Sequence, residues 1–262
     1  MTKAPEIPSV TLPGGADMPL LGFGTWQLRG SPGYECVLNA LELGYRHIDT
    51  ATMYGNEAEV GHALRDSRLD RSEIFVTTKL PPGKVGRERK TLTASLRALG
   101  TDYVDLWLVH WPPAPRTIIH VWCEFLALRE EGLARTVGVS NYSPAQIDAL
   151  IRATDQAPAV NQIPWSPALY DPHLLADNRE RGATVEGYSP LKGTDLGDPV
   201  LVQIASEHGV SPAQVVLRWH IEHGIPVIAK SARVPRIAAN IDLLSFTLSP
   251  DEMARIDALS RR

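Results

Sequence analysis

Eight short apolar runs recur along this chain at intervals of roughly 30 residues, with amphipathic stretches such as 57–64 and 92–99 between them. Continuous apolar runs are typical of parallel strands buried on both faces. Their alternation with helices is the pattern of repeated strand–helix–strand units. A (β/α)8 barrel takes about 250 residues. The chain of 262 residues is therefore predicted to be α/β, a single (β/α)8 TIM barrel with strands near 21–24, 46–49, 74–79, 104–110, 136–140, 159–163, 184–188 and 226–229.

A β-hairpin is predicted ahead of the barrel, because residues 10–12 and 18–21 flank the turn sequence Pro13-Gly14-Gly15-Ala16-Asp17. Two helices, 199–208 and 212–222, are expected between the last two strands. The second of them is marked by a capping serine followed by proline at its first position.

The main alternative architecture is a doubly wound open sheet, which binds dinucleotides through a glycine-rich loop after its first strand. Here the first strand runs through Gly22-Phe23-Gly24-Thr25-Trp26 into no Gly-x-x-Gly helix, so the closed barrel is favoured. Ser249-Pro250 predicts the start of a last helix that ends near Leu259 and leaves a short C-terminal tail. No linker divides the chain, and we expect residues 1–262 to form one domain.

Charge and composition narrow the partners that we expect. The net charge of −4 and the pI of about 6.1 argue against nucleic acid and against an anionic membrane surface. No signal-peptide or membrane-span pattern is present, which predicts a cytoplasmic protein, and we expect a monomer. Cys36 and Cys123 fall in helix-like stretches and are predicted to be buried thiols in a reducing compartment. Without clustered His and Cys at ligand spacing, no metal is expected.

Acid–base residues stand at three strand ends and in one following loop: Asp49, Lys79, His110 and Tyr54. Because the carboxyl ends of parallel barrel strands open on one face, these side chains are expected to meet there. A phenol has an ordinary pKa of about 10, and a neighbouring ammonium lowers it. We therefore expect Lys79, held by Asp49, to lower the pKa of Tyr54. Tyr54 would protonate the alkoxide formed when a carbonyl is reduced, and a neutral His110 would orient the carbonyl oxygen.

Each of these residues alone has a simpler explanation. Asp49 would serve as a cap, Lys79 as a surface lysine with its ammonium in water, and His110 as a hydrogen-bonded core imidazole. Four such residues at the ends of the right strands favour a catalytic site.

A set of motifs follows in order from about residue 10 to residue 259, each weak evidence alone. They are Gly22-Phe23-Gly24-Thr25-Trp26, His47-Ile48-Asp49-Thr50-Ala51, Tyr54-Gly55-Asn56-Glu57, Thr78-Lys79, Asp105-Leu106-Trp107-Leu108-Val109-His110-Trp111-Pro112, Gly138-Val139-Ser140-Asn141, Tyr188-Ser189-Pro190-Leu191 and Ala229-Lys230-Ser231 with Arg236-Ile237. In this order and spacing the chain resembles the aldo-keto reductase superfamily. The compact stretch from His110 to Trp122 is more similar to prokaryotic members, such as 2,5-diketo-gluconate reductase-like and aldehyde reductase-like proteins, than to animal aldose reductases.

The resemblance implies that the four acid–base residues are a catalytic tetrad, with the tyrosine as proton donor, and that the cofactor is NADPH or NADP. Ser140, Asn141 and Gln162 would hold the nicotinamide carboxamide, and Tyr188 would stack on the ring. A lysine, a serine and an arginine near a helix start would bind the 2′-phosphate. The full set of cofactor-binding residues that the resemblance implies is Gly24, Thr25, Asp49, Ser140, Asn141, Gln162, Tyr188, Ser189, Pro190, Leu191, Lys230, Ser231, Arg236 and Asn240.

The sequence departs from the family pattern at three places. Ala239 stands beside Asn240 where the family often has glutamate, which would weaken cofactor affinity or relax the preference for NADP. Ala229 replaces a common proline, and residues 164–167 replace a Glu-x-His-Pro sequence after Gln162. None of these departures touches the four acid–base residues.

The substrate pocket is predicted from the residues beside the cofactor loop and the catalytic histidine. Trp26 and Trp111 would form its walls, with Tyr54 and His110 at the reacting carbonyl. Met53 is equally well explained by packing at the barrel rim. A short tail would leave this pocket open and shallow, which predicts broad acceptance of small-molecule carbonyl substrates.

The sequence leaves one rival function of a different class. Barrels of this superfamily also serve as cofactor-binding, redox-sensing regulatory subunits of potassium channels with little turnover. The chain has no extra arm or docking segment, so an NADPH-dependent oxidoreductase that reduces aldehydes and ketones to alcohols is favoured. An aldolase with Lys79 as a Schiff-base nucleophile is disfavoured by the aspartate and tyrosine beside it.

Overall fold

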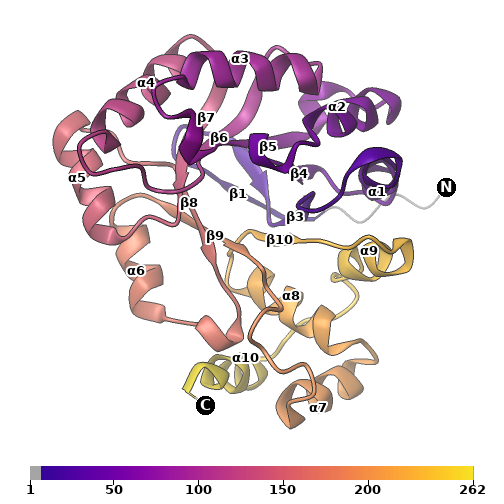
Figure 1. The fold of residues 1–262 in the computed structure, drawn as a ribbon. Helices are drawn as coiled ribbons and strands as arrows, with labels where there is room; N and C mark the ends of the chain where they lie inside the picture. Colours follow the sequence, from indigo (N-terminus) through magenta and orange to yellow (C-terminus); the bar gives the residue numbers. More distant parts are fainter. Residues whose placement is uncertain (1–6, 262) are drawn as a thin grey trace.

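The computed structural model describes residues 7–261, and its central feature is a closed barrel of eight parallel strands (Figure 1). The strands follow one another around the barrel in chain order, and the last closes on the first. Their bounds are β3 Leu21–Gly24, β4 His47–Asp49, β5 Phe75–Leu80, β6 Val104–Val109, β7 Ala134–Ser140, β8 Val160–Pro164, β9 Thr184–Tyr188 and β10 Val227–Ala229. The predicted (β/α)8 barrel is confirmed, and each strand lies within two residues of its expected position.

Helices surround the barrel on its outside (Figure 1). They are α1 Gly30–Glu42, α2 Glu57–Asp66, α3 Glu88–Leu99, α4 Ile118–Glu130, α5 Pro144–Thr154, α6 Pro172–Glu180, α7 Pro199–His208, α8 Pro212–Glu222, α9 Val234–Ile241 and α10 Pro250–Asp257. The side chains of Ser143, Ser211 and Ser249 cap α5, α8 and α10, each before a proline at the first helical position. The two helices expected between the last strands have the predicted bounds. No helix among residues 7–261 is long and apolar enough to cross a membrane.

The N-terminal hairpin pairs β1, Ser9–Thr11, with β2, Asp17–Pro19. The prediction extended its second strand to Leu21, which instead begins β3 of the barrel and pairs with Val227. The hairpin side chains Leu12 and Met18 are buried against barrel residues, in a cluster completed by Phe75, Leu106, Leu108 and Val160. The hairpin therefore closes one end of the barrel with apolar side chains.

The main core lies between the strands and the helices. Trp107 of β6 stacks on Phe125 of α4 with ring centroids 3.7 Å apart, and both rings are buried. The prediction for the cysteines is half right: Cys36 is buried, but Cys123 is exposed. The buried positions of α4 are Ile118, Val121, Trp122, Phe125 and Leu128, so Cys123 lies outside the face that packs on the barrel.

Candidate active site

Each of the eight barrel strands carries a predicted site residue among its last three residues or has one directly after its end. These residues are Gly24, Asp49, Lys79, His110, Ser140, Gln162, Tyr188 and Lys230. Parallel strands bring their carboxyl ends to one face of the barrel. The fold thus gathers on one face residues that are more than 200 positions apart in sequence.

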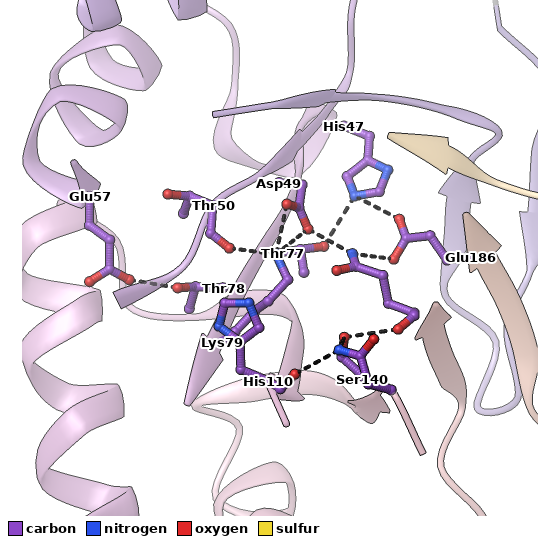
Figure 2. Close-up of polar contacts among 12 residues, drawn as sticks. His47, Asp49, Thr50, Glu57, Thr77, Thr78, Lys79, His110, Ser140 and Glu186 are labelled. Atoms are coloured by element: carbon purple, nitrogen blue, oxygen red, sulfur yellow. Dashed lines mark hydrogen bonds and ion pairs between the residues drawn. The ribbon is translucent and has the colours of Figure 1, made fainter. Parts of the chain in front are cut away.

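A buried ion pair lies at the centre of this face (Figure 2). Lys79 Nζ donates to both carboxylate oxygens of Asp49, at 2.7 Å and 2.6 Å, and to the Thr50 carbonyl at 2.9 Å. The lysine side chain is fully buried and that of Asp49 is 5% exposed. Burial alone would lower the pKa of Lys79, but the surrounding acidic groups, Asp49 foremost, together outweigh it and the pKa is raised. The lysine therefore carries a fixed positive charge inside the barrel.

Tyr54 ends the short helix Thr52–Tyr54 that follows β4, and its ring lies beside this charge. The Lys79 ammonium is 5.3 Å from the ring centroid, and the His110 ring packs edge-on at 5.8 Å. Burial raises the pKa of Tyr54, and the lowering effect of Lys79 does not cancel it. The expectation of a lowered phenol pKa is therefore wrong for this state of the protein, because the surroundings that bring the ammonium close also remove water.

His110 follows β6 directly and is mostly buried. Burial first, and the positive charge of Lys79 second, lower its pKa to about 4. The imidazole is neutral at pH 7, as the expected orienting role requires. Its Nδ1 atom has no hydrogen-bond partner among the residues that the structure describes.

Next to His110, four residues expected at the nicotinamide form one hydrogen-bonded group. Asn141, in the left-handed backbone region at φ 64°, donates to the His110 carbonyl at 3.1 Å and to Ser140 Oγ at 2.9 Å. Tyr188 OH donates to Asn141 Oδ1 at 2.8 Å. Ser140 Oγ donates to the Gln162 carbonyl at 2.8 Å. The structure thus brings the ends of β7, β8 and β9 together beside His110.

The side chain of Gln162 extends into the barrel. Its Nε2 atom donates to Asp49 Oδ2 and to Glu186 Oε2, both at 2.8 Å. Glu186 of β9 is completely buried and was not among the predicted site residues. The signal available in the sequence was a carboxylate in the middle of the predicted strand 184–188.

The residues expected at the cofactor phosphates lie around the ends of β9, β10 and β3. Lys230 and Arg236 are exposed, and no carboxylate within residues 7–261 forms an ion pair with either. Ser231 Oγ accepts from the Arg233 amide at 3.0 Å, just before α9, on which Asn240 is half-buried. Ser189 and Leu191 are half-buried and Pro190 is buried; Ser189 adopts the left-handed region at φ 55°.

Gly24 and Thr25 stand at the end of β3. A Cβ atom on Gly24 would lie 2.7 Å from Ile228 Cγ2, so glycine is needed there for β3 to pack against β10. Thr25 is fully buried, and its hydroxyl has no partner among the described residues.

Large apolar side chains remain exposed on the loops after the strands. Trp26 is 58% exposed, Met53 53% and Trp111 47%. Exposed aromatic side chains beside a polar site are typical of binding surfaces. No group of three or more possible metal-ligating side chains occurs in the part of the chain that the structure describes.

Comparison with known proteins agrees with this arrangement. A model described as the Aldo/keto reductase family matches residues 20–261. The chain belongs to the aldo-keto reductase family. It is 43% identical to an aldo-keto reductase of Mycolicibacterium vanbaalenii, over 99% of this chain and 94% of that protein. It is 42% identical to morphine 6-dehydrogenase of Pseudomonas putida, over 98% and 92%.

Solved structures show the same fold. An aldo-keto reductase from Brucella melitensis superposes with a TM-score of 0.93 at 42% identity, covering 97% of this chain and all of that one. A Bombyx mori aldo-keto reductase, solved in complex with NADP, superposes with a TM-score of 0.91 at 33% identity, covering 99% and 95%. Membership of this family supports an oxidoreductase with a nicotinamide cofactor.

Proposed function

We propose that this chain is an NADP(H)-dependent carbonyl reductase in which Tyr54 donates the proton to the product alcohol. The observation that carries the proposal is the buried Lys79–Asp49 pair beside the phenol ring of Tyr54. An ammonium in this position stabilises the phenolate that remains after proton transfer. Family membership supports the reaction class, and the tyrosine as donor is our assignment.

The chemistry follows from the charge states of these residues. When bound, the nicotinamide supplies a hydride to the carbonyl carbon, which leaves an alkoxide on the oxygen. The raised pKa of Tyr54 keeps the phenol protonated at neutral pH, so its proton is available for the alkoxide. Neutral His110 donates a hydrogen bond to the carbonyl oxygen and orients it. The reverse sequence oxidises alcohols, with the phenolate as base.

The residues present fit NADP. Lys230 and Arg236 are cations without a carboxylate partner among residues 7–261, which suits them to the 2′-phosphate. The hydroxyl of Thr25 is buried without a described partner at the end of β3, where a cofactor atom would satisfy it. Ser140, Asn141 and Tyr188 form a polar surface beside His110 that would take the carboxamide and support the ring.

For the substrate we propose small aliphatic and aromatic aldehydes and ketones, accepted broadly. Trp26 and Trp111 are about half exposed, so they bury only part of a bound molecule. Apolar contacts discriminate weakly, since one methylene is worth about 1–3 kcal/mol even in a closed pocket. Turnover should therefore follow the electrophilicity of the carbonyl more than its shape.

The Tyr54→Phe variant tests the proposal. It should lose reduction of a reactive aldehyde while binding NADPH nearly as tightly as the wild type, because only the phenol hydroxyl is removed. NADPH consumption by absorbance measures turnover, and quenching of protein fluorescence measures binding. Comparable turnover by Tyr54→Phe would show that another group supplies the proton. Wild-type protein that oxidises only one equivalent of bound NADPH would point instead to a redox-sensing subunit.

A further inference from the structure

Two buried carboxylates share a single amide group beneath the catalytic residues. Gln162 Nε2 has two hydrogens, and it donates one to Asp49 and the other to Glu186, each at 2.8 Å. Asp49 lies on β4, Gln162 on β8 and Glu186 on β9, and Figure 2 shows the side chains of Asp49 and Glu186. Asp49 and Glu186 are 4% and 0% exposed, so neither charge is screened well by water.

Only one cation is available to these two carboxylates among the described residues. Lys79 binds both oxygens of Asp49 and forms no hydrogen bond with Glu186 among the described residues. On the opposite side, His47 Nε2 lies 3.7 Å from Glu186 Oε1. His47 is fully buried, and burial lowers its pKa to about 4, so it is neutral at pH 7. Glu186 Oε1 has no hydrogen-bond partner among residues 7–261.

When two carboxylates share a site with one ammonium, the carboxylate farther from the ammonium takes up a proton. Asp49 is in contact with Lys79 and keeps its charge as the partner of that ammonium. Glu186 is therefore the carboxylic acid of the pair at neutral pH. Burial, and then the charge of Asp49, raise the pKa of Glu186 to about 8.

We propose that Glu186 is a positioning residue that sets the pH range over which Tyr54 donates its proton, acting through Gln162, Asp49 and Lys79. This inference rests on the proposed function of Tyr54. Above pH 8 the ionised Glu186 adds a negative charge below Lys79 and Tyr54, and this charge raises the pKa of the phenol further. The donor form of Tyr54 then persists to higher pH than it would with a neutral residue in place of Glu186.

Several titratable or hydrogen-bonding groups surround Glu186. They are His47 and Asp49 of β4, Lys79 of β5, Gln162 of β8 and, beyond the lysine, Tyr54. The histidine is neutral throughout the range of interest, and the aspartate and lysine neutralise each other. Glu186 is thus the group near Tyr54 whose charge changes around pH 8.

The Glu186→Gln variant removes this ionisation and keeps the shape, since the introduced amide oxygen still accepts from Gln162. The alkaline limb of kcat/KM for aldehyde reduction should move to lower pH, because the phenolate is no longer opposed by a second carboxylate. Alcohol oxidation, which needs the phenolate, should reach its plateau at lower pH. A purely structural role would lower both rates equally at every pH and leave the limbs in place.

Glu57→Gln is the matched control. Glu57 is also a buried glutamate, but it accepts from Thr78 and Ser95 outside the barrel interior. If the pH profiles of reduction and oxidation shift no further in Glu186→Gln than in Glu57→Gln, the inference is overturned.

Two measurements do not depend on turnover. Infrared spectra of the wild type should contain a protonated carboxyl band at pH 7 that disappears above about pH 8 and is absent from Glu186→Gln. Tyrosinate absorbance, taken as the difference between each protein and its Tyr54→Phe counterpart, titrates Tyr54 directly. Its midpoint should be lower in the Glu186→Gln background. A missing carboxyl band or an unchanged midpoint refutes the role of Glu186, whereas an inactive wild type with both signatures refutes only the proposed function.

Discussion

Replacing Asp49 by asparagine should destabilise the protein more than most single substitutions. In the wild type the Lys79 ammonium has both oxygens of Asp49 and the Thr50 carbonyl as acceptors. The variant keeps one acceptor oxygen, replaces the other with a donating NH2 group and removes the negative charge, so a fully buried ammonium loses its counterion. Breaking one side of a buried ion pair typically costs about 3–5 kcal/mol.

This cost translates into a measurable change in melting temperature. The entropy of unfolding is about 2.1 cal/mol/K per residue, which scales to about 0.55 kcal/mol/K for 262 residues. A loss of about 3–5 kcal/mol then lowers the apparent Tm by roughly 5–9 °C. Differential scanning calorimetry at pH 7 measures this change directly, at one scan rate for all variants.

Two comparisons separate the charge effect from general damage. The double variant Asp49→Asn with Lys79→Met removes both charges and should recover part of the lost Tm, because no unpaired ion remains. Glu131→Gln breaks the pair with Arg89, whose side chains are about half exposed, and should barely change the Tm. An Asp49→Asn protein with the Tm of the wild type, or a double variant with a lower Tm than the single one, would show that the unpaired Lys79 charge is not the source of the cost.

Further predictions concern the cofactor, the substrate and pH. Arg236→Ala should raise the Kd for NADPH about tenfold to a hundredfold, with little change in the Kd for NADH, as measured by fluorescence titration. Arg233→Ala is the neighbouring control. Equal losses of affinity for both cofactors would exclude a role of Arg236 at the 2′-phosphate. Trp111→Ala should raise KM for aromatic aldehydes more than for short aliphatic ones, and a uniform rise would argue against a pocket wall. The apparent Tm should fall as the pH drops from about 6.5 to 4. Burial lowers the pKa of His47, His110 and His220 to about 4, so in this range the unfolded chain binds protons that the folded protein does not. The raised pKa of Glu186 has the opposite effect, because it raises the Tm as the pH falls below about 8. The His220→Gln variant should lose less Tm between pH 6.5 and 4 than the wild type. An equal loss of Tm in the two proteins would contradict a buried neutral His220.

The barrel was predictable because its signals are local and repeat eight times. Most strands lie in short segments rich in apolar residues, and proline after a capping serine marks the starts of α5, α8 and α10. The meeting of Asp49 with Lys79 followed from topology alone, since parallel strand ends share one face of the barrel.

Burial and side-chain direction could not be obtained in the same way. The sequence places Lys79 near Tyr54, but the direction of the phenol pKa depends on how much water the folded chain excludes. Resemblance assigned Gln162 to the nicotinamide, and only the structure shows its amide nitrogen held between two carboxylates. Cys123 was misplaced because its helix is apolar on several sides, so its sequence does not reveal which side packs on the barrel.

Stability does not explain why the barrel interior contains this polar chain. Replacing a buried ion pair with well-packed apolar residues is often neutral or stabilising. The apolar layer around the barrel, where Trp107 stacks on Phe125, already supplies a large buried core. The chain from Glu186 through Gln162 and Asp49 to Lys79 is better explained by what it does to charge. Each member is hydrogen-bonded to the next, and the last, Lys79, holds its ammonium beside the phenol ring of Tyr54.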